Sequence, residues 1–493
     1  MNKARLRLLL VFVFFFLFFS APQQVRKFAY SDSMIGTTTY FHVRMAEMLL
    51  KGQLFDPLSF GGRPYTYPPG FHLLLAGFLS VKEFLLPFIG ALGLVLCYYF
   101  ARELGFNDEE ALTASGILGL IPGYVYLSGH LNPRMPALLL MILTFFLIKK
   151  AENNPHYEYL ASITFMFALL THPFAAFIGA LFGLILFIRR LKNVLVPLFL
   201  GGSIFVIAWL LPLLLFNGIP PQLDFYHEYI ELRSGVQYFV FEAAVVSDSI
   251  GALTIIAALY SALKLKTKGV NFLKLWLFLS IAASMIVGNR LNEMMLFPVA
   301  MLAAKTVISL WSEFTDTFHL TDFVKNNHFW LAGFLFYSAL AGLLAAGSLM
   351  YFPPSPADYS AMLWIRENTP EDSVVMGYWQ DGHWITGIAQ RKNVIDAYAE
   401  FAPDVDDRYY SMLKVMEGSD VDEALKVLRK YNVKYIYYPL INKKYCTGFS
   451  YLSRYPYFEK VFSSGDKFVF KVDYSGKAVP FDLCDHFIKD VSK

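Results

Sequence analysis

The chain has 493 residues, 56% of them hydrophobic and 17% aromatic, and its formal net charge is +3 at pH 7. This composition is typical of an integral membrane protein and argues against a water-soluble enzyme. The small net charge, with no stretch that resembles a nucleic-acid-binding module, argues against DNA or RNA as a partner. Two of the three cysteines, Cys446 and Cys484, lie in the polar C-terminal part, and the sequence leaves open whether they pair.

The first apolar run, residues 8–19, follows three basic residues near the N-terminus. We interpret it as a retained membrane span, although a cleaved secretory signal has a similar pattern. Later runs of about spanning length are residues 84–101, 110–128, 135–148, 157–171, 173–188, 194–216, 250–263, 272–287, 291–310 and 329–351. The sequence therefore predicts a multi-pass protein of the cell membrane with about 11 spans.

The basic residues between these runs predict the orientation. With a cytoplasmic N-terminus, alternate connections collect cations, at positions 102, 149–150, 189–192, 264–268 and 325, as the positive-inside rule requires. An odd number of spans then places the C-terminal part outside the cytoplasm. We expect residues 1–352 to form the membrane domain, with outer loops at residues 30–82, 129–134 and 217–248.

The C-terminal part, residues 353–493, is more polar and has the size of a small domain. Its pattern favours helices over residues 358–368 and 421–429 and strands over residues 374–376 and 433–438. The sequence therefore predicts an extracytoplasmic α/β domain. In the first outer loop, residues 31–50 favour an amphipathic helix with Ser31, Asp32 and Ser33 as capping residues.

Four segments occur in a recognisable order: TTYFHVRMAEMLLKGQLFD with YTYPPG, ALTASGILGLIPGYVYLSGHLNPRMPALLLMILTF, GNRLNEMMLFPVAMLAA, and MGYWQDGHWITGIAQRKNVIDA. Together they resemble the catalytic subunit of oligosaccharyltransferases, which are membrane glycosyltransferases of the GT-C type. The resemblance covers most of the chain. It implies a GT-C fold and transfer of a sugar or glycan from a polyprenyl (dolichyl) phosphate-linked donor to a glycan or protein acceptor on the outer face.

The chain departs from that family at its metal site and at its acceptor signature. Where the family has an Asp and an acidic pair, this sequence has Thr38, Asn132 and Arg134, which are poor ligands for a hard divalent cation. An Arg at such a position supplies the positive charge that the metal would otherwise bring. A divalent metal, Mg²⁺ or Mn²⁺, stays an open alternative. The family's WWDYG signature becomes YWQDG at residues 378–382, which puts Asn-directed protein glycosylation in doubt.

Two carboxylates are candidates for a general base that deprotonates the acceptor. Asp32 is the first candidate and Asp56 the second. The alternatives are a helix cap for Asp32 and a turn residue for Asp56.

Three arginines are candidates for binding the donor phosphate. Arg290 matches the family arginine that touches phosphate, and Arg134 and Arg44 are further candidates. The alternatives are lipid headgroup contacts for Arg290, and for Arg44 a salt bridge on the helix face, for example to Glu47, or lipid headgroup contacts.

Seven residues are candidates for binding the acceptor or the sugar. By resemblance, Glu242 matches the acidic residue of a TIxE-like motif in the loop at residues 217–248. His130 and Asn132 carry hydrogen-bonding groups that suit a sugar or simply solvate a loop. The others form an aromatic and ionisable cluster that suits sugar stacking or is a buried turn: Trp379, Asp381, His383 and Trp384.

Three alternatives stay open. The first is a metal-dependent oligosaccharyltransferase acting on protein Asn, with ligands from positions such as Asp32, Glu228 and Glu242. The second is a non-catalytic relative that binds lipid-linked glycans. The third is a transporter, which is disfavoured because transporters place ionisable groups near the bilayer midplane and this chain places them in outer connections.

Overall fold

The computed structural model describes residues 3–29, 31–217, 251–287, 289–317, 329–399, 402–439 and 455–478. These residues form two compact units. The first takes its described residues from 3–25, 68–212 and 251–351. The second takes them from 26–67, 213–217 and from 352 onward. Residues 31–67 of the first predicted outer loop therefore belong to the same unit as the C-terminal domain.

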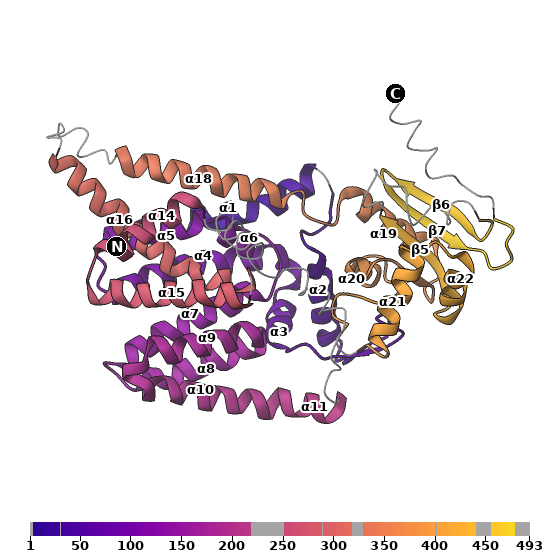
Figure 1. Ribbon diagram of the computed structural model, residues 1–493, viewed down its shortest axis with the longest axis horizontal. Helices are drawn as coiled ribbons and strands as arrows, with labels where there is room; N and C mark the ends of the chain where they lie inside the picture. The colour runs from indigo at the N-terminus through magenta and orange to yellow at the C-terminus, as the bar shows by residue number, and fades with distance from the viewer. Residues whose placement is uncertain are drawn as a thin grey trace. The chain divides into compact units, whose positions relative to one another are not determined.

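The first unit is helical, and each predicted apolar run coincides with one or more helices. In Figure 1, α7 to α10 run alongside one another. The helices are α1 (Lys3–Ala29), whose end belongs to the second unit, α3 (Gly70–Gly77), α4 (Lys82–Glu103), α5 (Asp108–Leu120), α6 (Pro122–Gly129), α7 (Arg134–Ala151), α8 (His156–Thr171), α9 (Pro173–Leu186), α10 (Leu191–Phe205), α14 (Ala252–Lys264), α15 (Lys268–Val287), α16 (Leu296–Thr317) and α18 (Phe329–Leu349). A further helix, α11 (Leu211–Asn217), begins in the first unit and ends in the second. Short 3-10 turns precede α4, α10 and α16, and the last is η4 (Asn289–Met295).

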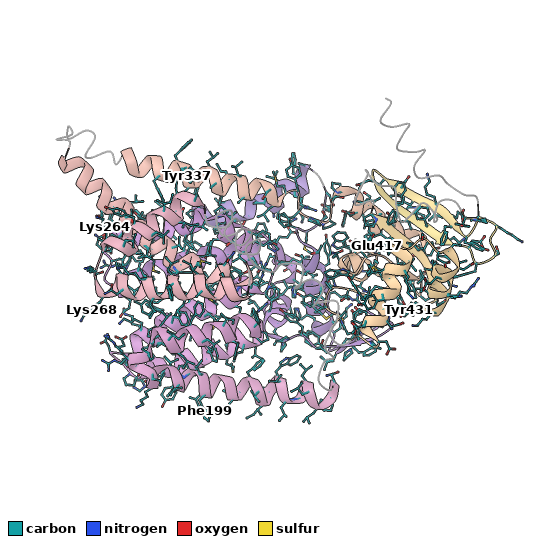
Figure 2. All side chains as sticks on the ribbon, in the orientation of Figure 1. Phe199, Lys264, Lys268, Tyr337, Glu417 and Tyr431 are labelled. Carbon is teal, nitrogen blue, oxygen red and sulfur yellow. The ribbon has the colours of Figure 1, made fainter. Side chains whose placement is uncertain are left out.

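Three described helical segments are long and apolar enough to cross a membrane: Lys3–Ala29, Leu79–Glu103 and Ile188–Asn217. A fourth results if α5 and α6, bent by 67° relative to each other, form one broken span. Pro122 explains the bend, because it lacks the N–H that would continue the helix. The number of about 11 spans stays a prediction. Phe199 on α10 is 73% exposed and points away from the helices, as a lipid-facing side chain would (Figure 2).

The second unit is mixed. Its elements are α2 (Thr37–Leu50), β1 (Phe55–Asp56), β2 (Arg63–Pro64), α19 (Pro356–Asn368), β3 (Val374–Met376), η5 (Trp379–Asp381), α20 (Gly382–Gly387), β4 (Lys392–Asn393), α21 (Val405–Met416), α22 (Val421–Lys430), β5 (Val433–Pro439), β6 (Phe458–Ser464) and β7 (Lys467–Val472). The five-stranded sheet has the order β4-β3-β5-β7-β6. Its first three strands are parallel and the last two pairings antiparallel. Figure 1 shows α22 beside this sheet, and α21 packs on α22.

All four elements predicted in the C-terminal part are present, with ends shifted by a few residues at most. The predicted helix over residues 31–50 is wrong at its start. It begins at Thr37, and its N-cap is Gly36 with a φ of 102°. Tertiary bonds hold the preceding segment instead: Met34 N donates to the Tyr40 hydroxyl at 2.8 Å, and Gly36 N donates to the Pro353 carbonyl at 2.9 Å.

Candidate functional site

The β1–β2 hairpin places a buried carboxylate opposite a buried arginine, because Asp56 and Arg63 are paired in its register. Arg44 from α2 donates to Asp56 twice, from Nε at 3.0 Å and from Nη2 at 2.6 Å. Leu58 N and Ser59 Oγ donate to the same carboxylate at 2.9 and 3.0 Å. Burial alone would raise the pKa of Asp56, but the bonds and charge of Arg44 outweigh it and lower that pKa. Arg44 therefore orders the loop here.

A second buried pair joins the loop to the C-terminal domain. Arg63 Nη1 lies 3.2 Å from Asp396 Oδ1, and both side chains are at most 3% exposed. Asp396 also accepts from Tyr398 N at 2.9 Å and from the amide of Asn393 at 3.3 Å. Burial opposes the charge of Asp396, but Arg63 and the hydrogen bonds keep its pKa below the ordinary value.

Aromatic rings from both parts of this unit pack beside these pairs. Phe41 lies 4.4 Å from Tyr398 and 5.2 Å from His383, measured between ring centroids. His42 and Tyr67 complete a five-ring group, with their centroids 5.4 Å apart. His42 is fully buried, and its Nε2 lies 3.5 Å from the Tyr398 hydroxyl. His42 therefore contacts the C-terminal domain and not solvent.

The predicted acceptor cluster lies on η5 and α20. Asp381, His383 and Trp384 are 6%, 0% and 4% exposed, whereas Trp379 is half-buried. Asp381 Oδ2, both ring nitrogens of His383 and Trp384 Nε1 have no hydrogen-bond partner among the described residues. Burial, with the nearby charge of Asp358, raises the pKa of Asp381 to about 8, and burial lowers the pKa of His383 to about 4. The cluster is thus an internal turn with unsatisfied polar atoms, and Trp379 is its more exposed member.

In the first unit, Arg134 begins α7 and pairs with Glu293 of η4 at 2.7 Å. The amide of Asn132 donates to the carbonyls of Leu127 and His130 at 2.9 and 2.8 Å, and its oxygen accepts from Met135 N at 3.0 Å. Asn132 therefore stabilises the turn before α7.

His130 and Arg290 both belong to the first unit. His130 Nδ1 donates to the Tyr126 carbonyl at 2.7 Å, and its side chain is 8% exposed. Arg290 lies in η4, but its side chain is outside the described part. The amide of Asn292, two residues further on, is buried without a hydrogen-bond partner among the described residues.

Asp32 is exposed in the bend before α2. Glu242, Cys446, Cys484 and almost all of the loop at residues 217–248 lie outside the described residues. The sequence did not single out Glu293 as a partner of Arg134 or Asp396 as a partner of Arg63. For each pair, the only signal in the sequence was an arginine in one segment and an acidic residue in a distant one.

The metal site implied by the oligosaccharyltransferase resemblance does not fit these residues. Within the described ranges, no three His, Cys, Asp or Glu side chains converge to hold a metal ion. The side-chain amide of Asn132 is already hydrogen-bonded to backbone groups. Arg134 carries a positive charge that would repel a cation.

Comparisons with known proteins connect this architecture to glycosyltransferases. No protein-family model matches the chain. A curated relative, dolichyl-phosphooligosaccharide-protein glycotransferase 2 of Archaeoglobus fulgidus, is 22% identical over 495 residues, covering 81% of each chain. The structure of an A. fulgidus oligosaccharyltransferase tethered to an acceptor peptide aligns with a TM-score of 0.65 and 16% identity, covering 89% of this chain and 69% of that chain.

ArnT from Cupriavidus metallidurans, bound to undecaprenyl phosphate, aligns with a TM-score of 0.62 and 12% identity over 96% of this chain and 99% of its own. These alignments confirm the predicted GT-C fold. The C-terminal sheet confirms that a domain of mixed helices and strands exists. The chain is therefore a membrane glycosyltransferase with the GT-C fold, similar to the catalytic subunits of oligosaccharyltransferases.

Proposed function

We propose that this chain transfers a sugar or glycan from a polyprenyl-phosphate-linked donor to an acceptor on the outer face of the membrane. The alignment of nearly the whole chain with ArnT bound to undecaprenyl phosphate carries the proposal. In the same proposal the N-terminus is cytoplasmic and the C-terminal domain extracytoplasmic, as the distribution of basic residues predicts.

On the donor side, Arg134 and Arg290 are the proposed phosphate-binding residues. Charge builds on the leaving phosphate as the glycosidic bond breaks, and a fixed cation stabilises it. Arg134 remains accessible for this role, because its side chain is 36% exposed and its 2.7 Å ion pair with Glu293 is made by Nη1. Arg44 is a weaker candidate, since both its bonds go to Asp56.

On the acceptor side, Asp32 is the proposed general base. It removes the proton of the attacking group while the sugar moves to that group and the lipid phosphate leaves. Asp56 is less suited, because Arg44 lowers its pKa and three groups already donate to it. Trp379 is the proposed contact for the acceptor at the turn, and Glu242, His130, Asp381, His383 and Trp384 stay weaker candidates.

A second candidate function is a metal-dependent oligosaccharyltransferase that acts on protein Asn. The name of the A. fulgidus relative and the peptide tethered to the solved oligosaccharyltransferase favour it. We rank it second because Thr38, Asn132 and Arg134 do not supply the carboxylates that such a metal requires. We derive no step through a metal.

The test compares donors and metal dependence with purified protein in detergent. A polyprenyl-phosphate sugar and a polyprenyl-diphosphate oligosaccharide are offered, each with a sequon peptide or a lipid-linked glycan, with and without EDTA. We expect transfer from the monophosphate donor that survives EDTA and falls at least about tenfold in Arg134→Met, a loss of roughly 1.4 kcal/mol of transition-state stabilisation or more. The matched control is Lys149→Met, which removes the partner of Glu152 in an ion pair at the other end of α7.

Peptide glycosylation that EDTA abolishes would establish the second candidate instead. Donor binding without turnover on either acceptor would identify a non-catalytic glycan-lipid-binding relative.

A further inference from the structure

Asp396 lies where three segments of the second unit meet. Its carboxylate pairs with Arg63 of β2 at 3.2 Å and accepts from Ser59 Oγ at 3.4 Å. It also lies 3.7 Å from Nδ1 of His383 in α20. At Gly382, a Cβ would lie 2.6 Å from the Cβ of Asp396, so this turn packs directly on Asp396. Asp396 therefore contacts both the first outer loop and the turn over residues 379–384.

Asp396 is also linked to Asp56 through a shared hydroxyl. Ser59 Oγ lies 3.0 Å from Asp56 and 3.4 Å from Asp396. Arg44 neutralises the first carboxylate and Arg63 the second. Because all four charges are largely buried, a change at one carboxylate alters the hydrogen bonds of the other.

The loop is built into the C-terminal domain around this link. Phe60 is 4% exposed and belongs to the same hydrophobic core as Met376 and Ile395. Asn393 fixes the chain on both sides, since its N–H donates to the Leu58 carbonyl at 3.0 Å and its side chain accepts from Phe60 N at 2.9 Å. This packing and these hydrogen bonds join the loop to the C-terminal domain.

Helix α2 approaches the turn in the same way. At Gly387 of α20, a Cβ would lie 2.8 Å from the Cβ of Tyr40 in α2. Arg63 also places its guanidinium 4.9 Å from the Phe41 ring, so the residue that binds Asp396 contacts α2 as well. A shift of Asp396 would thus alter contacts on both the α2 side and the α20 side of the α2–α20 contact.

We propose that Asp396 is a positioning residue, which holds the turn over residues 379–384 in register with α2 so that an acceptor bound at the turn is correctly placed. The acceptor role rests on the proposed function, whereas the coupling of the two segments does not. Asp396 does not touch the reacting groups in this proposal.

The test is hydrogen exchange of the full-length protein in detergent, read by mass spectrometry, in Asp396→Asn. The variant keeps the shape of the side chain and removes its charge. We expect exchange at least about threefold faster in residues 37–63 and in residues 379–396, with α22 and β5 unchanged. The matched control is Asp407→Asn, since Asp407 binds Lys430 and Tyr431 at the surface of the same domain (Tyr431 is labelled in Figure 2).

Steady-state kinetics then separates positioning from stability. We expect a rise of at least about fivefold in the acceptor KM of Asp396→Asn, with donor affinity within about twofold of wild type. Ser59→Ala, which keeps both ion pairs, should show the same two loosened segments to a smaller degree. It replaces Asp396→Asn if that variant does not fold.

Uniformly faster exchange across the domain, or loosening of one segment alone, would overturn the coupling. Loosening of both segments with an unchanged acceptor KM would overturn the positioning role. If the wild type shows no transfer, the proposed function fails, and the exchange data alone decide whether the two segments are coupled.

Discussion

Replacing Arg44 with alanine tests how far the first outer loop depends on a buried charge pair. The change removes two N–H donors from Asp56, whose side chain is 2% exposed. Removing one partner of a buried ion pair costs about 3–5 kcal/mol. Because Arg44 is itself 17% exposed and Asp56 keeps two other donors, we expect about 2–3 kcal/mol. In a unit of about 200 residues this lowers Tm by roughly 4–12 °C.

The size of this loss depends on pH in a direction that Asp56 determines. In the native protein the pKa of Asp56 is lowered, so its contribution to stability is present above its unfolded pKa and is lost as pH falls. Without Arg44, burial raises that pKa, and protonation then relieves part of the cost in acid. The difference in Tm between wild type and Arg44→Ala should therefore be smaller at pH ~5 than at pH ~7.5.

Tryptophan fluorescence of the detergent-solubilised protein during heating measures this difference. The matched control is Lys414→Ala, which breaks an ion pair with Glu423 that is about half exposed. Exposed pairs contribute about 0–1 kcal/mol, so the control should lower Tm by less than roughly 4 °C. An Arg44→Ala variant that matches the control, or a difference that grows in acid, would refute the reasoning.

Two further changes probe the C-terminal domain. Burial raises the pKa of Asp381 to about 8, so the folded state holds a proton that the unfolded chain loses, and stability falls as pH rises toward that value. Asp381→Asn should therefore gain Tm relative to wild type between pH ~5 and ~8.5, and a gain that shrinks with rising pH would contradict this assignment. Phe60→Ala should cost about 3–5 kcal/mol, because Phe60 lies in the domain core. Phe55→Ala, whose ring is 55% exposed, should cost far less in the same melt, and equal losses would count against a core role.

The helices and several strands were predictable because their signals are local. The apolar runs became helices, and residues 374–376 form β3 as predicted. The start of α2 was not predictable in this way. Asp32 and its neighbours are good capping residues, but bonds from Tyr40 and Pro353 hold residues 34–36 outside the helix. Tertiary contacts overrode a local preference.

The sequence predicted which residues belong to the candidate site better than it predicted which residues they pair with. Arg44 and Asp56 were both singled out, but not as a bidentate pair. Two contacts join segments that are separated in the sequence by the whole predicted membrane domain. Phe60 lies in the core of the C-terminal domain, and Arg63 binds Asp396. No periodicity or spacing within one segment carries information about such a pairing.

The most direct test of the account is transfer of a labelled sugar from a polyprenyl phosphate by the purified wild-type protein, beside Asp32→Asn. The account predicts that label appears on the acceptor, that EDTA does not prevent it, and that Asp32→Asn lowers the rate by at least about a hundredfold, as for a lost general base. Bound donor with label that stays on the lipid, whichever acceptor is offered, would contradict the claim that this chain is a glycosyltransferase.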